Sequence, residues 1–170
     1  MPYEAVAPDC DEDAIRTDSP DETARLRAIA KAVSVARERP DALVIGADQV
    51  VDLDGELLGK PGSAEGARAQ LGRLAGRVHR LITAVAFVVR GNRPEVALDV
   101  HRMSVRPLDE AEIGRYVAAD DPAWCAGSYK VESLGIALFD RIEGDDATAI
   151  VGLPLMAVCS MLRRSGWALP

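Results

Sequence analysis

Apolar positions along this chain follow two periods, which alternate from one segment to the next. Runs rich in Val, Ile and Leu predict strands at residues 42–53, 56–59, 78–90, 95–108 and 134–144, and residues 3–7 resemble the end of another. Apolar residues at helical spacing predict helices at residues 20–37, 63–74, 108–119 and 154–166. The alternation predicts an α/β fold, with a mixed, twisted sheet flanked by helices and an antiparallel hairpin turning at Gly91 and Asn92.

Turn and cap residues mark the ends of these elements. Ser19 precedes Pro20, and Glu22 follows three residues after Ser19, which is the pattern of a helix N-terminus with a capping box. Asp54-Gly55 predicts a tight turn between two strands. The apolar spacing of the first helix predicts four buried side chains, namely Leu26, Ile29, Ala30 and Val33.

Length and composition favour one globular domain that spans residues 1–170. The net charge of −7 argues against a protein held on DNA or RNA by neutralised phosphates. No apolar run is long enough to span a membrane, and the N-terminus lacks the features of a signal peptide. Three widely spaced cysteines argue against a disulfide framework, so we expect a cytoplasmic protein.

The segment "GADQVVDLDGELLGKP" contains Asp48 and Gln49 inside an otherwise apolar strand. Burying a carboxylate is costly unless a partner compensates for the lost water. Ligands in open α/β sheets bind beyond the carboxyl ends of strands, and we expect both residues near such an end. The alternative is structural, with Asp48 capping a turn or pairing with a core arginine.

Five further charged residues fall close to strand or helix ends and could join Asp48 in a phosphate site. They are Glu12, Lys31, Lys60, Lys130 and Glu132. Carboxylates hold divalent cations or take protons from water, and lysines offset the charge of phosphate oxygens. The structural alternatives are a solvated loop for Glu12, a surface lysine for Lys31 and a solvated pair for Lys130 and Glu132.

Other chemistries find little support in the sequence. The chain has neither a G-x-x-x-x-G-K-[ST] loop nor a G-x-G-x-x-G loop, which argues against P-loop NTPases and dinucleotide-binding oxidoreductases. His79 has no serine and acid partners at familiar spacing, so we expect a structural role. Cys125 has no histidine placed to activate it, and we interpret it as a core or loop thiol.

Several blocks together resemble the Maf family of nucleotide pyrophosphatases, from about residue 3 to residue 165. The blocks are "AKAVSVA", "VIGADQVVDLDGELLGKP", "LGRLAGRVHRLITAV" and "GSYKVESLGIALFDRIEGDDATAIVGLP". The resemblance implies a Maf/ITPase-like fold and hydrolysis of a nucleoside triphosphate to a monophosphate and pyrophosphate, assisted by Mg²⁺ or Mn²⁺. Together with the composition, it predicts an enzyme without membrane or nucleic-acid partners. A homodimer is also among the expectations.

The resemblance also assigns roles to residues. Asp48 matches the proton acceptor of the family, Glu12 with Asp48 the metal ligands, and Lys31 and Lys60 the phosphate-binding lysines. Gln49 and Glu132, with Lys130 just before, are similar to the branch that acts on 7-methyl-GTP rather than on dTTP and UTP. Glu132 would accept hydrogen bonds from the N1–H and N2–H₂ edge of guanine.

One family feature has no match in the sequence. An S-x-x-R-[RK] loop that cradles the triphosphate, together with the strand and helix that flank it, would precede "AVAPDCDED". The sequence thus predicts a shortened domain that lacks the first strand and helix, with weak activity. The alternative is a catalytically impaired protein that binds nucleotides or regulates division.

Overall fold

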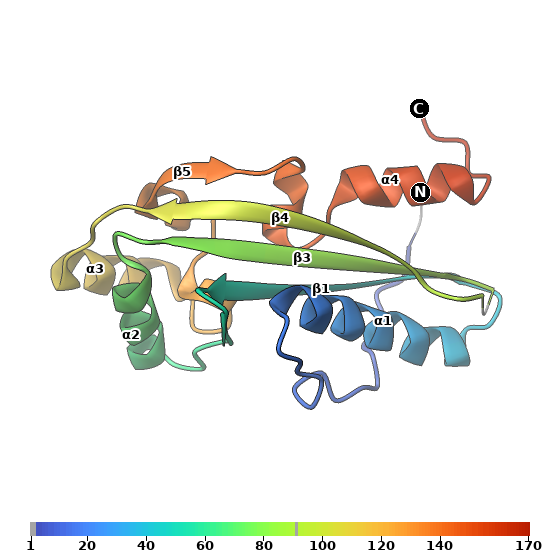
Figure 1. Ribbon diagram of the computed structural model, residues 1–170, viewed down its shortest axis with the longest axis horizontal. Coiled ribbons are helices and arrows are strands. Elements are labelled where there is room, and N and C mark those ends of the chain that lie inside the picture. Colours follow the sequence, from blue (N-terminus) through green and yellow to red (C-terminus); the bar gives the residue numbers. More distant parts are fainter. Residues whose placement is uncertain (1–2, 91) are drawn as a thin grey trace.

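The computed structural model describes residues 3–90 and 92–170 and contains one five-stranded sheet in the order β2-β1-β3-β4-β5 (Figure 1). The strands are β1 (Leu43–Leu53), β2 (Glu56–Leu58), β3 (Val78–Val89), β4 (Glu95–Val105) and β5 (Phe139–Glu143). The α/β class is confirmed, but every strand pair in the described part is antiparallel, so the sheet is not mixed. The reason is that β1 reverses into β2, after which β3 returns beside β1, and β4 reverses again.

The helices cover both faces and one end of the sheet. They are α1 (Pro20–Glu38), α2 (Ala64–Leu74), α3 (Glu110–Asp120) and α4 (Leu155–Arg164), with short 3₁₀ turns η1 (Ala126–Ser128), η2 (Leu134–Leu138) and η3 (Ala147–Val151). Side chains alternate along β3, so Ala84 and Ala86 pack against α1 while Val85 and Phe87 pack against α4 on the opposite face. Figure 1 shows α2 and α3 together at one end of the sheet. No helix within residues 3–90 and 92–170 is both long and apolar enough to cross a membrane.

The predicted helix N-terminus at Ser19 and the turn at Asp54-Gly55 are confirmed, but the capping box is only half formed, because the Ser19 N–H donates to Thr17 Oγ1 at 3.3 Å and not to Glu22. The Ser19 side chain accepts a hydrogen bond from the backbone N–H of Glu22, and the Ser63 side chain accepts one from that of Gly66. Asp54 and Gly55 both have positive φ angles, 55° and 89°, as the primed turns of tight hairpins require.

Helix α1 packs through its alanines rather than through its larger side chains. The fully buried members are Ala24, Ala28 and Ala32, with Ala36 almost so, whereas Leu26, Ile29, Ala30 and Val33 are only partly buried. The expectation for those four residues was therefore wrong. The cause is close packing at Gly46, because a Cβ atom there would lie 2.6 Å from the Ala28 carbonyl oxygen.

Two other predicted strands differ in the structure. Residues 3–7 form no strand, and residues 134–138 form the η2 turn, so that β5 starts only at Phe139. Gly135 explains the second difference, because its backbone N–H binds the Lys130 carbonyl and a Cβ atom at this position would lie 2.5 Å from that oxygen. Of the predicted hairpin turn, Gly91 lies outside the described residues.

Candidate active site

A cavity of about 820 Å³ lies where the edge of β1 is uncovered. β1 pairs with β3 from Leu43 to Asp52, but β2 covers the other edge only at residues 51–53. Asp48 and Gln49 both line the cavity, and because successive side chains alternate they reach it from opposite faces of the sheet. The expectation that they lie at the carboxyl end of the strand was wrong, since five further residues of β1 follow Asp48. The binding position that was expected at the end of a strand lies instead along the uncovered edge of β1.

The centre of the site is an ammonium group shared by two carboxylates. Lys31 Nζ donates to Asp48 Oδ1 at 2.7 Å and also pairs with the Glu12 carboxylate. Asp48 is only 8% exposed, and its Oδ2 atom is buried without a hydrogen-bond partner among the described residues. Asp48 therefore pairs with a lysine, and the structural alternative of a pair with a core arginine was wrong.

Burial and charge act on these groups in opposite directions. Burial raises the pKa of Asp48, against the hydrogen bond and charge of Lys31, which lower it. The hydrogen bond from Lys31 holds the pKa of Glu12 below its usual value, against a smaller effect of burial. Burial disfavours the charged form of Lys31, but the two carboxylates outweigh it and raise the pKa of the ammonium. Glu12 and Lys31 are thus ionised at neutral pH, while Asp48 is a stronger base than an exposed aspartate.

Hydrogen bonds to the first helix fix the irregular segment that carries Glu12. Arg27 on α1 donates from Nε to the Ile15 carbonyl at 3.0 Å, and the Ile15 N–H binds the Glu12 carbonyl at 3.2 Å. Lys60, in the Gly-Lys-Pro segment after β2, has Nζ 3.9 Å from Glu12 Oε1 and lines the same cavity. These contacts bring Glu12, Lys31, Asp48 and Lys60 together, although they are far apart in the sequence.

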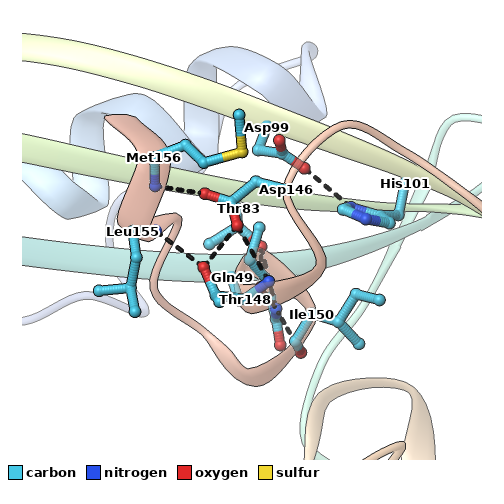
Figure 2. Close-up of polar contacts among 10 residues, drawn as sticks. Gln49, Thr83, Asp99, His101, Asp146, Thr148, Ile150, Leu155 and Met156 are labelled. Atoms are coloured by element: carbon cyan, nitrogen blue, oxygen red, sulfur yellow. Dashed lines mark hydrogen bonds and ion pairs between the residues drawn. The ribbon is translucent and has the colours of Figure 1, made fainter. Parts of the chain in front are cut away.

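A second polar network fixes Gln49 on the other face of β1 (Figure 2). The Gln49 amide nitrogen lies within 3.1 Å of Thr83 Oγ1 and of the Ala149 and Ile150 carbonyl oxygens. Thr83 Oγ1 in turn donates to the Ala149 carbonyl at 2.9 Å. Since the carbonyls can only accept, the amide nitrogen must face them, and the Gln49 amide oxygen is the group that a ligand can use.

A neighbouring set of hydrogen bonds, centred on Asp146, holds η3 in place as one wall of the cavity. Asp146 Oδ1 accepts from the Thr148 N–H and hydroxyl, and Asp146 Oδ2 accepts from the Met156 N–H at 2.7 Å (Figure 2). These bonds connect the start of η3 to the first turn of α4. Ile150, Val151 and Gly152 line the cavity from this segment.

The predicted residues after α3 separate into two positions. Glu132 is exposed and lines the cavity. Lys130 is not part of the lining, because its ammonium donates to the Asp120 carbonyl at 2.5 Å and its backbone N–H donates to the Tyr116 hydroxyl. The orientation of Lys130 therefore does not agree with a ligand contact in this cavity.

Comparison with known proteins identifies the family of the chain. The model of the family described as "Maf-like protein" matches residues 1–165. The chain belongs to the Maf family. A relative from Xanthomonas campestris pv. campestris (strain 8004), named 7-methyl-GTP pyrophosphatase, is 48% identical over 170 residues, covering 100% of this chain and 88% of the relative. Relatives of the same name from Aromatoleum aromaticum and Cupriavidus pinatubonensis are 46% and 44% identical, and the matches cover 88% and 84% of those proteins. The family expected from the sequence is thereby confirmed.

Four residues that were not predicted from the sequence also line the cavity of this Maf protein. Arg16, Arg27, Trp124 and Tyr129 all contribute to the lining. Arg27 lies one helical turn before Lys31, and this i, i+4 spacing could have indicated a shared face. The Tyr129 hydroxyl and His79 Nε2 form a hydrogen bond at 2.8 Å, and His79 is buried. The structure therefore agrees with the structural role expected for His79.

The carboxylates of the site fit part of a divalent metal site. Within residues 3–90 and 92–170 there is no group of three or more His, Cys, Asp or Glu that could hold a metal ion. Mg²⁺ is nevertheless commonly bound by one or two carboxylates, with substrate phosphates and water completing its shell. Glu12 and the unpartnered Oδ2 atom of Asp48 supply such a pair, and Lys31 is the cation that they share in this structure.

Proposed function

We propose that this chain is a nucleoside triphosphate pyrophosphatase that hydrolyses 7-methyl-GTP to 7-methyl-GMP and pyrophosphate. The observation that carries the proposal is the Asp48 carboxylate, which lines the cavity with one oxygen on Lys31 and the other without a partner. A buried polar atom without a partner is rare in folded proteins, and catalysis is one of the few reasons to retain it. The family membership and the names of the relatives add support for the class of reaction.

In the proposed reaction Asp48 accepts a proton from a water molecule. The resulting hydroxide attacks the α-phosphorus, the bond between this phosphorus and the oxygen that bridges to the β-phosphate breaks, and pyrophosphate leaves. A general base works best when its pKa lies near the working pH, and burial moves the pKa of Asp48 in that direction. Lys31 and Lys60 would offset the charge of the phosphate oxygens.

Glu12 and Asp48 are the residues that would hold a divalent cation, either Mg²⁺ or Mn²⁺. When bound, such a cation withdraws charge from the phosphate oxygens. Lys31, which pairs with both carboxylates, limits the repulsion between them.

Gln49 and Glu132 are the groups we assign to the base. The Glu132 carboxylate can accept hydrogen bonds from the N1–H and N2–H₂ groups of guanine, whereas thymine and uracil offer only a single N3–H donor between two carbonyl oxygens. Gln49 presents its amide oxygen to the cavity because Thr83 and the η3 carbonyls hold its nitrogen. A guanine-type base is therefore favoured over dTTP and UTP.

A panel of triphosphates tests the proposal. The purified chain is incubated with 7-methyl-GTP, GTP, dTTP or UTP and with Mg²⁺ or Mn²⁺, and pyrophosphate and monophosphate are both quantified. We expect equal amounts of the two products and the highest kcat/KM for 7-methyl-GTP. Release of orthophosphate instead would contradict the proposed bond cleavage, and a nucleotide-induced thermal shift without products would favour a nucleotide-binding protein.

A further inference from the structure

Trp124 is the large apolar side chain of the cavity lining that is most exposed. It is 70% exposed, whereas Pro122 and Ala123 directly before it are buried. The short segment that carries it is fixed by its backbone, because the Ala123 carbonyl accepts from the Gly62 N–H at 2.8 Å and the Pro122 carbonyl accepts from the Cys125 N–H at 3.1 Å. The indole is therefore not packed in the core, and the fixed backbone holds it at the cavity.

The segment that begins with Trp124 also brings a carboxylate to the cavity. Among the residues of 124–132 that line the cavity, Glu132 is the charged one. Burial raises the pKa of the Cys125 thiol, and the carboxylates of Glu132, Asp120 and Asp121 raise it further against the charge of Lys130. Three carboxylates and the ammonium of Lys130 therefore lie close enough to Cys125, the neighbour of Trp124, to act on its charge.

An exposed aromatic ring and a carboxylate that line one cavity are suited to a flat cation. The face of an indole carries the negative part of its quadrupole, and tryptophan is the best of the aromatic residues for holding a positive charge. A purine methylated at N7 is both flat and positively charged, whereas guanine is flat and neutral. Both bases can stack on the indole, but only the methylated base is also attracted through its positive charge.

We propose that Trp124 determines the specificity of this cavity by stacking on a positively charged, N7-alkylated purine, with Glu132 as the accompanying anion. The inference rests on the proposed function and adds that the feature recognised is the positive charge of the base. A neutral ring of the same shape is then a poor substrate. The substrate class is the group of cationic purine nucleoside triphosphates.

The direct test compares 7-methyl-GTP with 7-deaza-7-methyl-GTP, which has the same outline but no charge. We expect the wild type to favour the charged nucleotide in kcat/KM on the order of tenfold. In Trp124→Leu this preference is lost, mainly through a higher KM for 7-methyl-GTP, and Trp124→Phe retains part of it. Trp167→Leu is the matched control, because Trp167 is also exposed, at 46%, but does not line the cavity. An unchanged preference in Trp124→Leu would overturn the inference.

A binding measurement separates this inference from the proposed function. Trp167→Phe leaves Trp124 as the single tryptophan of the two in the sequence, so its fluorescence reports on the cavity alone. We expect 7-methyl-GMP to quench this emission at concentrations on the order of tenfold lower than GMP. Quenching without pyrophosphate release supports the inference and counts against the enzyme, whereas pyrophosphate release with no quenching, or with equal quenching by both nucleotides, counts against the inference.

Discussion

At the scale of the residue, the Lys31 ammonium organises the site. It joins Glu12, from an irregular segment, to Asp48 in the middle of β1. A cation between two carboxylates allows both to be close together in a partly buried place, where like charges would otherwise repel each other. The same ammonium opposes the rise in the pKa of Asp48 that burial causes. Lys31 thus sets how basic Asp48 is.

Replacing Lys31 with methionine should move the acid side of the pH–rate profile. Without the ammonium the pKa of Asp48 rises further, because burial is no longer opposed. The proposed reaction needs ionised Asp48, so the rate should fall off at a higher pH than in the wild type. The measurement is kcat for 7-methyl-GTP as a function of pH, and total activity should also drop because a phosphate-binding charge is gone.

The matched control is Lys31→Arg, which retains a cation beside the two carboxylates. We expect its acid limb to stay close to that of the wild type even if its rate is lower. An acid limb at the same pH in Lys31→Met and in the wild type would show that Lys31 does not tune Asp48.

His79 makes the stability of the fold depend on pH. Burial lowers the pKa of His79 from 6.5 to about 4, although the charge of Asp52 acts against this. The unfolded chain gains the proton as the pH falls below 6.5, and the folded chain does so only near 4. The free energy of unfolding should therefore decrease over this interval, by about 3 kcal/mol at its end.

The variant His79→Phe removes this titration and can pack with the neighbouring rings of Tyr129 and Phe139. Urea unfolding at a series of pH values from 7 to 4 should give a shallower loss of stability in the variant. Parallel curves for the two proteins would mean that His79 is not held neutral.

Single residues also show how far the sequence leads. Asp48 could be identified because a carboxylate interrupts an apolar strand. Its pairing with Lys31 could not, since 17 positions separate them and no period connects a helix to a strand. Lys130 was assigned by proximity to Glu132, but side-chain direction in an irregular segment follows local hydrogen bonds. The apolar pattern did not indicate Trp124, because that pattern reports buried positions and Trp124 is exposed.

At the scale of the element, the contact between α1 and β1 positions Lys31 beside Asp48. Alanines spaced four residues apart on α1 allow the helix to approach Gly46, two residues before Asp48. The sequence predicted the bounds of α1 well, from its cap residues, but not its buried face. Amphipathic spacing favours the large residues, and only the three-dimensional approach reveals that the smallest ones lie closest.

Gly46→Ala should therefore destabilise the protein and impair the site. The new Cβ atom would lie 2.6 Å from the Ala28 carbonyl oxygen and the Ala32 nitrogen, which are both backbone atoms, so α1 must move away. Overpacking of this kind costs roughly 1–3 kcal/mol, readable as a lower midpoint of urea unfolding. Because α1 carries Lys31, the kcat for 7-methyl-GTP should fall as well.

Gly72→Ala is the control for this substitution. Gly72 lies in α2, where an added Cβ atom meets nothing within 4 Å. Alanine is the better helix former, so this variant should gain up to about 1 kcal/mol. Equal effects of the two substitutions would contradict the close approach of α1 to β1.

At the scale of the whole molecule, the cavity is assembled from distant parts of the chain around one open strand edge. The N-terminal segment, α1, the turn after β2, the segment after α3 and η3 all contribute to it. The sequence analysis predicted most of the polar members and the fold class. It could not predict that Asp48 and Gln49 reach the cavity from opposite faces, because this depends on how little of β1 is covered by β2.

The most direct test of the account is the rate of pyrophosphate release from 7-methyl-GTP by Asp48→Asn. The asparagine oxygen can still accept from Lys31, so the fold and the affinity for 7-methyl-GTP should persist, with a Kd within a few-fold of the wild type. The loss of the base should lower kcat by roughly 10²- to 10⁴-fold, whereas Asp140→Asn, an exposed carboxyl on β5 outside the cavity, should leave kcat unchanged. Wild-type turnover by Asp48→Asn would contradict the account.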